Sequence, residues 1–371
     1  MTFENIKTGI ISEKQLVKYF GTPAQKKSYS ENGRFIGGYK KKFFDKLKRY
    51  CKIEDLGDRK YKITKVYEFP LPANFNKMNS SIYKYIVPLI LSMLTKGHDE
   101  SRKVDITVGK WAREIKMVNK NYNLMKYNQE AVSEEFEYPT KAIAEFYEKS
   151  DDMINYYITN ALDYLKSAGL IIWRDVYKIV TEESSGTVHL DHKGEVHTEV
   201  TLTTKQASQD DMDYYATCIK IADEENNITN ASDRYYSKKA KRFQSILSRE
   251  LYKKGIKNVY KTYEAYYINL DKCKFILDAF QIKSMESLIE NFNSEFESMI
   301  VENAKKRYKK IPSKYSYCKD DEIYSICFSG MCDMTINHKT DYLGERIKPK
   351  KTENYKLDAQ VKNISEVNDG L

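Results

Sequence analysis

The stretch from residue 38 to residue 67 constrains the fold of this chain most, because its pattern changes from helical to extended spacing within a few residues. Four apolar side chains recur at helical spacing and predict a buried stripe: Phe43, Phe44, Leu47 and Tyr50. The rest of that helix is basic, with Lys40, Lys41, Lys42, Lys46, Lys48 and Arg49. After Cys51 the pattern alternates every two residues, which predicts a strand over 52–55, a tight turn and a second strand over 61–66. The sequence therefore predicts a basic helix followed directly by a short β-hairpin.

This order of elements is typical of a winged helix, in which a helix enters a DNA groove and the hairpin lies against the phosphate backbone. A shorter helix over 13–20, with Ser12 as its N-cap, precedes the basic helix, and a segment over 25–38 separates the two. The alternative is that the lysine-rich face is simply solvated. Because the charge is one-sided, we predict DNA contacts by Lys40, Lys41, Lys42, Lys46 and Arg49, and by Arg59 and Lys60 at the hairpin tip.

Length and charge set outer limits on the class of protein. A chain of 371 residues has room for two or three domains. Its net charge of +9 favours an anionic partner, but 53 acidic residues accompany the 62 basic ones, so the positive field must be local. The six cysteines are dispersed and no apolar leader follows Met1, which predicts a cytoplasmic protein with reduced thiols. The apolar run over 82–94 is short and interrupted, so we expect a buried helix and no membrane partner.

A second winged helix is predicted over 82–205, after a linker over 70–81 that is rich in proline and asparagine. Its expected helices cover 82–94, 108–118 and 150–168, and Gly169 is the residue that ends the last of them. A long wing then follows, from 170–180 and back along 195–203.

The basic residues of this second unit lie before its last expected helix. Asp151 and Asp152 at the expected start of that helix suit the helix dipole but repel phosphate. We therefore assign DNA contact to the preceding basic residues Lys110, Arg113, Lys116, Lys120 and Lys126. The alternative is a winged helix used for protein interaction or dimerisation.

The predicted fold class is α+β and mainly helical, with tandem winged helices and a helical C-terminal domain. The first winged helix covers 1–69 and the C-terminal domain covers 206–341, with helices over 239–253 and 284–308. Residues 342–371 are charged and poor in large apolar clusters, which predicts a disordered tail.

Two phrases, LKRYCKIEDLGDRKYKITKVYE and TVGKWAREIKMVNKNY, resemble those of winged-helix proteins encoded by phages, plasmids and other mobile elements of Gram-positive bacteria. The resemblance covers at most the first half of the chain. It implies DNA binding, and it is compatible with replication initiation or transcription regulation.

Motifs for catalysis are not found in the sequence. A Walker motif, HExxH and GxSxG are all missing, which argues against an NTPase, a metalloprotease or a serine hydrolase. Two sets of residues could be imagined to bind a metal: His189, His192 and His197 on the expected wing, and Cys318, Cys327, Cys332 and His338. Neither set has a paired CxxC knuckle, so an exposed wing and buried thiols in a strand-like segment are favoured. We predict no metal, no cofactor and no catalytic residue, although a tyrosine nucleophile among the 31 tyrosines is left open.

The predicted function is sequence-specific binding of double-stranded DNA by a protein of a mobile element, as a replication initiator or transcriptional regulator. Two linked winged helices give avidity without a catalytic site. A second copy of the chain or a host protein is a further candidate partner. The alternative function is a phage-encoded interaction protein that binds and inhibits a host or defence protein.

Overall fold

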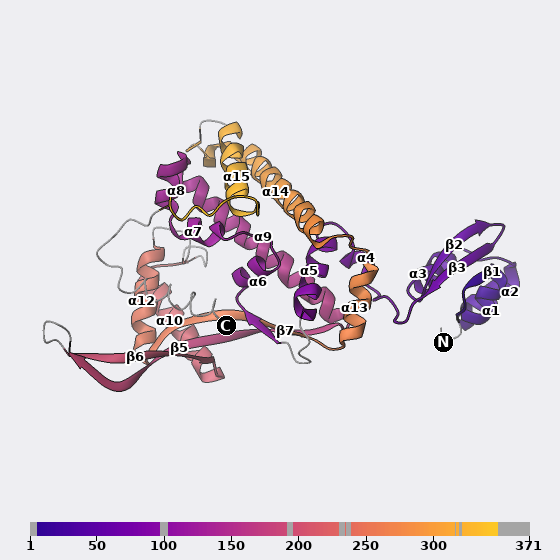
Figure 1. The fold of residues 1–371 in the computed structure, drawn as a ribbon, viewed down its shortest axis with the longest axis horizontal. Helices are drawn as coiled ribbons and strands as arrows, with labels where there is room; N and C mark the ends of the chain where they lie inside the picture. Colours follow the sequence, from indigo (N-terminus) through magenta and orange to yellow (C-terminus); the bar gives the residue numbers. More distant parts are fainter. Residues whose placement is uncertain are drawn as a thin grey trace. The chain divides into compact units, whose positions relative to one another are not determined.

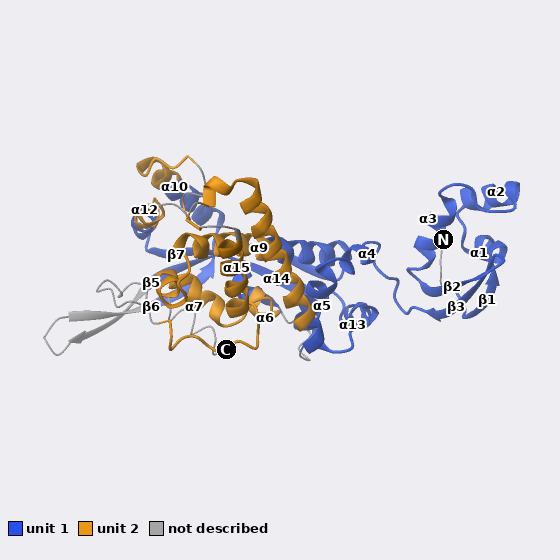
Figure 2. Cartoon of the chain, turned by 90° about the horizontal axis from the view of Figure 1, so that it is seen from above, with its two compact units in different colours: residues 1–111, 156–219, 247–288 blue, residues 112–155, 220–246, 289–371 orange. Residues whose placement is uncertain are grey.

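The computed structural model describes residues 6–96, 103–190, 196–229, 234, 239–315, 317–318 and 321–347. With 58% of its residues in helices and 17% in strands, the protein is α+β, as the sequence predicts. Two compact units are present, and each is made from separate segments of the chain (Figure 2). Unit 1 comprises residues 1–111, 156–219 and 247–288, and unit 2 comprises residues 112–155, 220–246 and 289–371.

The first part of unit 1 combines three helices with a three-stranded antiparallel sheet (Figure 1). The elements are, in chain order, β1 (Gly9–Ser12), α1 (Glu13–Phe20), α2 (Pro23–Asn32), α3 (Tyr39–Leu47), β2 (Cys51–Gly57) and β3 (Lys60–Val66). Strand β3 is central, with β1 and β2 on either side. The predicted basic helix and hairpin are therefore present. Strand β1 was not expected, and α2 occupies part of the segment interpreted as a loop.

Local sequence signals explain where α1 and α2 begin. Ser12 and Gln15 form a capping box, in which the Gln15 N–H donates to Ser12 Oγ at 3.3 Å and the Ser12 N–H donates to Gln15 Oε1 at 3.0 Å. Thr22 and Gln25 form a second capping box at the start of α2. The two helices are therefore separated by little more than Gly21 and Thr22, which prevents them from joining into one.

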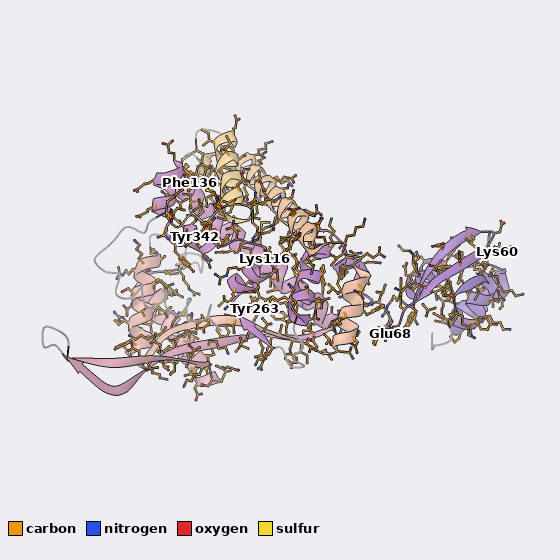
Figure 3. All side chains as sticks on the ribbon, in the orientation of Figure 1. Lys60, Glu68, Lys116, Phe136, Tyr263 and Tyr342 are labelled. Carbon is orange, nitrogen blue, oxygen red and sulfur yellow. The ribbon has the colours of Figure 1, made fainter. Side chains whose placement is uncertain are left out.

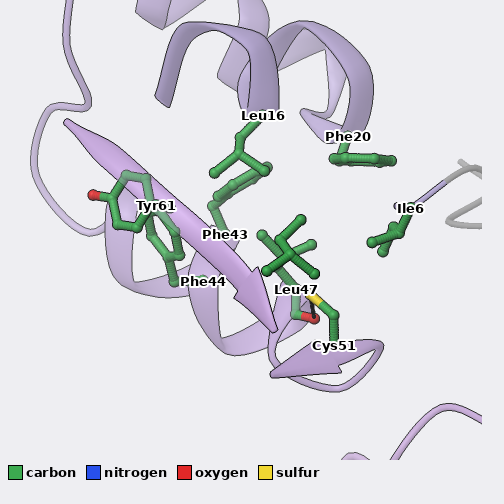
Figure 4. Packing of buried hydrophobic residues seen from close by; sticks show 9 residues of the cluster. Ile6, Leu16, Phe20, Phe43, Phe44, Leu47, Cys51 and Tyr61 are labelled. Atoms are coloured by element: carbon green, nitrogen blue, oxygen red, sulfur yellow. Dashed lines mark hydrogen bonds between the residues drawn. The ribbon is translucent and has the colours of Figure 1, made fainter. Parts of the chain in front are cut away.

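The core of this part lies between the sheet and the apolar faces of α1 and α3 (Figure 4). Its buried side chains are Ile6, Leu16, Phe20, Phe43, Phe44, Leu47, Cys51, Tyr61 and Ile63. The ring centroids of Phe44 and Tyr61 are 4.6 Å apart, so α3 packs directly on β3. Each fully buried large side chain contributes roughly 1.5–3 kcal/mol relative to an exposed one. The apolar stripe predicted on α3 is confirmed, and it leaves the basic face of that helix on the outside.

A four-stranded antiparallel sheet organises the rest of unit 1 (Figure 1). Its strands are β4 (Val104–Ile106), β5 (Ile171–Leu190), β6 (Val196–Gln206) and β7 (Ile256–Tyr267), in the order β4-β7-β5-β6. The β5–β6 pair is the long hairpin expected from the sequence. Strand β7 comes from a segment that was expected to be helical, and it lies between β4 and β5. Its tyrosines and β-branched residues favour a strand, and a neighbour on each side satisfies its backbone.

The helices of this second part of unit 1 precede, separate or follow the strands of the sheet along the chain. They are α4 (Phe75–Met78), α5 (Tyr83–Thr95), the N-terminal part of α6 (Val108–Glu114), the C-terminal part of α9 (Thr140–Ser167), the N-terminal part of α10 (Gln209–Glu225), the C-terminal part of α12 (Ala240–Tyr252) and α13 (Leu270–Ala279). Helix α4 lies within the segment predicted as a linker, where Asn74 Nδ2 donates to the Tyr164 carbonyl oxygen at 3.0 Å. Trp111 Nε1 donates to the carbonyl oxygen of Tyr263 at 3.1 Å, which fixes the middle of α6 to β7. These contacts make one folded body of segments far apart in the sequence.

Gly169 connects α9 to β5 in the way the sequence predicts. Its φ is +64°, in the left-handed region that glycine adopts without strain. The Gly169 N–H donates to the Lys166 carbonyl at 2.9 Å and the Leu170 N–H donates to the Leu165 carbonyl at 3.0 Å. This pair of bonds is the Schellman motif, which ends a helix and satisfies its last carbonyls.

Unit 2 is built mostly from helices. They are α7 (Asn121–Tyr127), α8 (Gln129–Phe136), most of α14 (Met285–Lys310), the 3₁₀ turn η1 (Pro312–Tyr315), α15 (Asp321–Thr335) and the remaining parts of α6, α9, α10 and α12. Phe146 of α9 packs on Phe328 of α15 with ring centroids 5.6 Å apart. The segment around Phe328 was expected to be strand-like and is a helix. Its buried residues recur every three or four positions, at Tyr324, Cys327, Phe328, Met331 and Cys332.

Part of the predicted tail also belongs to unit 2. Leu343 and Ile347 are buried, and Arg346 forms an ion pair with Glu135 at 2.7 Å. The Leu343 N–H donates to Asn121 Oδ1 at 3.0 Å. These contacts order residues 342–347, and the remainder of the predicted tail lies outside the described residues. Within the described part of the chain, every helix is too short or too polar to cross a membrane.

Candidate nucleic-acid interface

Positive charge is concentrated in the first part of unit 1. In residues 6–66, lysine and arginine outnumber aspartate and glutamate by 17 to 6, while the whole chain has 62 against 53. The remainder of the protein is therefore slightly acidic. A local excess of this size creates a field that attracts polyanions, whereas a uniformly spread charge of +9 would not.

Helix α3 presents most of its predicted contact residues to solvent. Lys41, Lys42 and Lys46 are exposed, as is Lys48 just after the helix. Phe43, Phe44 and Leu47 on the opposite side are buried, which fixes the rotation of the helix about its axis. The lysine side chains therefore stay on the outer face.

Lys40 differs from the other lysines of α3 because it lies beside a buried carboxylate. Its Nζ lies 3.6 Å from the carboxylate of Glu13, whose side chain is only 4% exposed. Tyr61 donates its hydroxyl proton to the same carboxylate at 3.1 Å. A hydrogen bond with Tyr61, together with the nearby Glu13 charge, raises the pKa of Lys40. Lys40 therefore neutralises a buried carboxylate, and it is less available to phosphate than its neighbours.

The two arginines predicted as contacts in the first winged helix, Arg49 and Arg59, hold neighbouring segments in place. Arg59 Nη1 donates to the carbonyl oxygen of Gly33 at 2.9 Å, which joins the hairpin tip to the end of α2. Arg49 Nε donates to the carbonyl oxygen of Leu71 at 2.8 Å, just after β3. Lys60 is exposed at the start of β3 (Figure 3). Of these three residues, Lys60 has the side chain best placed to meet a ligand.

The hairpin carries further lysines that were not predicted as contact residues. Lys52 of β2 is directly opposite Lys65 of β3, and both are exposed. Lys62 is exposed in β3 and is paired with Glu54 and Ile10 of the flanking strands. The alternation of Lys60 and Lys62 with the buried Tyr61 and Ile63 is the sequence signal that places these lysines on the outer face. Together with α3, they give the hairpin and the helix the same sign of charge.

The contact residues predicted for the second winged helix (82–205) are distributed over both compact units. Lys110 is in unit 1, and Arg113, Lys116 and Lys120 are in unit 2. Lys110 and Arg113 are partly buried and have partners within the protein. Lys116 is exposed in a left-handed conformation with φ of +60°, and Lys120 lies 5.1 Å from the ring centroid of Tyr342 (Figure 3). These residues do not form a charged face comparable to that of α3.

The prediction that Asp151 and Asp152 lie at the start of a helix is wrong. Helix α9 begins at Thr140, so Asp151 and Asp152 lie in its middle rather than at its N-terminus. The polar segment before them continues the helical spacing of buried residues, with Phe146 and Tyr147. Asp151 accepts from Lys126 Nζ at 2.6 Å and from the Tyr122 hydroxyl at 2.9 Å. Lys126 is therefore paired within the protein.

The cysteines considered for a metal are buried, and the side chains of the histidine set lie outside the described residues. Burial raises the pKa of the Cys327 thiol to about 12, which keeps it protonated. His338 Nε2 lies 2.9 Å from the Lys116 carbonyl oxygen. The backbone of His189 pairs with that of His197, and His192 lies outside the described residues. Over the part of the chain that is described, no three His, Cys, Asp or Glu residues are grouped as metal ligands.

Tyr317 of unit 2 is hydrogen-bonded to a carboxylate that also interacts with an arginine. Its hydroxyl donates to Glu145 Oε2 at 2.9 Å, and Arg307 Nε approaches Glu145 Oε1 at 3.3 Å. Burial and the Glu145 charge both raise the pKa of Tyr317. A tyrosine nucleophile requires easier loss of its proton, so this environment is the opposite of an activating one.

Comparisons with known proteins give no relative: no family model, no curated protein and no solved structure matches this chain.

Proposed function

We propose that this protein binds double-stranded DNA through residues 6–66, acting as a winged helix. Helix α3 would lie in the major groove, and the β2–β3 hairpin would lie along the phosphate backbone. The observation that carries this proposal is the excess of positive charge in a segment whose basic helix α3 buries its apolar side in a core and exposes its lysines, while the rest of the chain is slightly acidic. Phosphate contacts supply most of the affinity of such an interface.

The order of strands supports a second copy of the same arrangement. In the first sheet the order is β1-β3-β2, so the last strand in sequence lies between the first two. Strands β4, β7 and β5 repeat this order, again with helices between the first strand and the second. In this interpretation β7 completes the second winged helix, and β6, α10 and α12 are an insertion into it. The second copy lacks a basic helix face, so it would extend the interface or bind a partner protein.

The function proposed for the whole chain is that of a sequence-specific DNA-binding protein of a mobile element, either a replication initiator or a transcriptional regulator. One basic winged helix gives the element that contacts bases and phosphates. Selection of bound duplexes from fragments of the element's own DNA would identify the site, and its position at an origin or a promoter would separate the two roles.

A charge-removal experiment tests DNA binding. The variant with Lys41→Gln, Lys42→Gln and Lys48→Gln removes two exposed charges from the outer face of α3 and one from the residue just after it. Fluorescence anisotropy at several salt concentrations should show weaker binding to every duplex, with the salt slope reduced by about 0.9 for each lost phosphate contact. The matched control carries Lys241→Gln, Lys274→Gln and Lys283→Gln, which removes three exposed lysines from the acidic remainder.

The outcomes of this experiment separate the candidate functions. Equal losses in both triple variants would mean that net charge alone, rather than α3, governs binding. If the unmodified protein fails to bind duplex DNA below micromolar concentration, the protein-interaction function becomes the better account.

A further inference from the structure

The C-terminal half of α14 has cations on two of its faces. Asn303, Lys306, Arg307 and Lys310 recur at helical spacing on one face, and Lys305 and Lys309 lie on another. Lys305, Lys306, Lys309 and Lys310 are all exposed. Cations in the last turn of a helix are ordinary partners of its dipole. That explanation does not account for Lys149, a further lysine that α9 contributes beside them.

An open groove of about 340 Å³ lies between α9 and α14 within unit 2. Its lining residues are Lys149, Asp152, Met153, Asn303, Lys306, Arg307 and Lys310. Four of these side chains are cationic and one is anionic, so the lining has a clear positive excess. The volume is at the lower end of the range for small-molecule sites, and it is large enough for one or two phosphate groups.

Arg307 is held rigidly at this groove. Its Nε lies 3.3 Å from Glu145 Oε1, and its guanidinium lies 5.4 Å from the ring centroid of Phe328. Nη2 of the same group is buried without a hydrogen-bond acceptor. Because Nη2 is buried, a ligand in the groove would meet Arg307 mainly as a fixed positive charge beside Lys306 and Lys310.

The lysines around Arg307 differ in how strongly they are already neutralised. Lys149 is paired with Glu148 at 2.5 Å, and Lys306 is 3.7 Å from Glu302, with both side chains of that second pair exposed. Exposed pairs of this kind are weak and readily exchange for a better anion. Lys310 is exposed at the end of the helix. An incoming phosphate could therefore engage Lys306, Arg307 and Lys310 together at small cost.

We propose that the α9–α14 groove of unit 2 is a binding site for a phosphate group, held by Arg307 with Lys306 and Lys310. This site is separate from the proposed DNA interface of residues 6–66 and does not depend on it. The same chemistry could come from a free nucleotide or from a nucleic-acid backbone, and the experiment distinguishes these two sources.

The test uses the full chain and a pair of variants on one helix. Lys306→Gln with Lys310→Gln removes two charges from this groove. Lys305→Gln with Lys309→Gln removes two charges from the same turns but on the side of the helix that lines a second groove, with Ile326 and Ser329. Calorimetric titration with inorganic pyrophosphate, and separately with ATP, should show saturable binding. The first variant should lose on the order of tenfold in affinity for each lysine removed, and the second should stay within a few-fold of the unmodified protein.

Anisotropy with duplex DNA on the same variants identifies the source of the phosphate. Loss of both DNA and pyrophosphate binding in the first variant indicates a backbone contact, and loss of pyrophosphate or ATP binding alone indicates a free nucleotide. The α3 triple variant should retain pyrophosphate binding, so failure of the DNA proposal leaves this one intact. Equal behaviour of the two α14 variants toward pyrophosphate, ATP and DNA would overturn the site.

Discussion

The Glu13 carboxylate lies 3.6 Å from the Lys40 ammonium group, and this ion pair joins the first turn of α1 to the first turn of α3. The carboxylate is almost fully buried, and the Tyr61 hydroxyl of β3 donates to it as well. A buried charge is tolerated only when it is paired and hydrogen-bonded. Glu13 therefore fixes the basic helix against both the sheet and α1, from beneath the surface that we propose contacts DNA.

Replacement Glu13→Ala should destabilise this part of the protein by about 1–3 kcal/mol, because it leaves Tyr61 without its acceptor and Lys40 without its partner. Hydrogen–deuterium exchange in the full chain should show faster exchange in peptides from α1 and β3. The exposed neighbour Lys14 provides the control, since Lys14→Ala alters the same turn without touching the buried cluster. Unchanged exchange in β3 would show that the ion pair is not needed for packing.

Replacement Gly169→Ala should cost roughly 1 kcal/mol of stability. The reason is the backbone, because a Cβ at this position would meet only Lys272 Nζ, at 3.8 Å. Gly109→Ala is the matched control: Gly109 is in α6, its added Cβ would meet nothing within 4 Å, and alanine should stabilise the helix by roughly 0.5–1 kcal/mol. Thermal denaturation should move in opposite directions for the two variants, and a shared direction would contradict the argument.

Local patterns predicted the elements that local contacts stabilise. The α3 helix, its hairpin and the Gly169 junction follow from the spacing of residues near one another in sequence. Strand β1 has four residues and exists because β3 pairs with it from a distance of some fifty positions, which no local pattern contains. Strand β7 had a visible signal, since Val259, Tyr260 and Tyr263 follow Gly255, but its partner β5 is distant in the chain.

The sequence likewise predicted the location of the candidate DNA interface but not which of its residues have partners within the protein. Charge in the sequence located the basic segment, but it gave no sign that Lys40 and Arg59 are engaged by Glu13 and Gly33. Those partners come from α1 and the end of α2, and only the tertiary fold brings them close. Lys62 was missed although strand alternation places it on the outer face beside Lys60.

Alkaline pH should unfold unit 2 together with ionisation of its buried tyrosines. Burial raises the pKa of Tyr122, Tyr147, Tyr317 and Tyr324. An unfolded tyrosine has a pKa of about 10, so above that pH the folded state retains more protons than the unfolded state. The stability is therefore fully present below about pH 10 and falls as the pH rises further. Ultraviolet absorbance should show these tyrosines ionising only as circular dichroism reports unfolding.

Tyr317→Phe serves as the control for that titration. It removes one buried hydroxyl and the hydrogen bond to Glu145, so the late step should lose one tyrosine in amplitude. A single titration of all tyrosines with the helices intact would contradict the burial of these four groups.

Replacement Lys52→Glu should raise stability and weaken DNA binding at the same time. Lys52 is directly opposite Lys65 in the β2–β3 pair, and like charges in that relation repel. A glutamate would turn the repulsion into attraction and stabilise the hairpin by roughly 0.2–1 kcal/mol.

The same change from Lys52 to glutamate places a negative charge on the surface proposed to face phosphate, so the anisotropy titration should show lower affinity for every duplex. Lys241→Glu changes the charge equally at an exposed site in the acidic remainder, and it should alter DNA affinity much less. A Lys52→Glu variant that is more stable and binds DNA as well as the unmodified protein would place the hairpin outside the DNA interface.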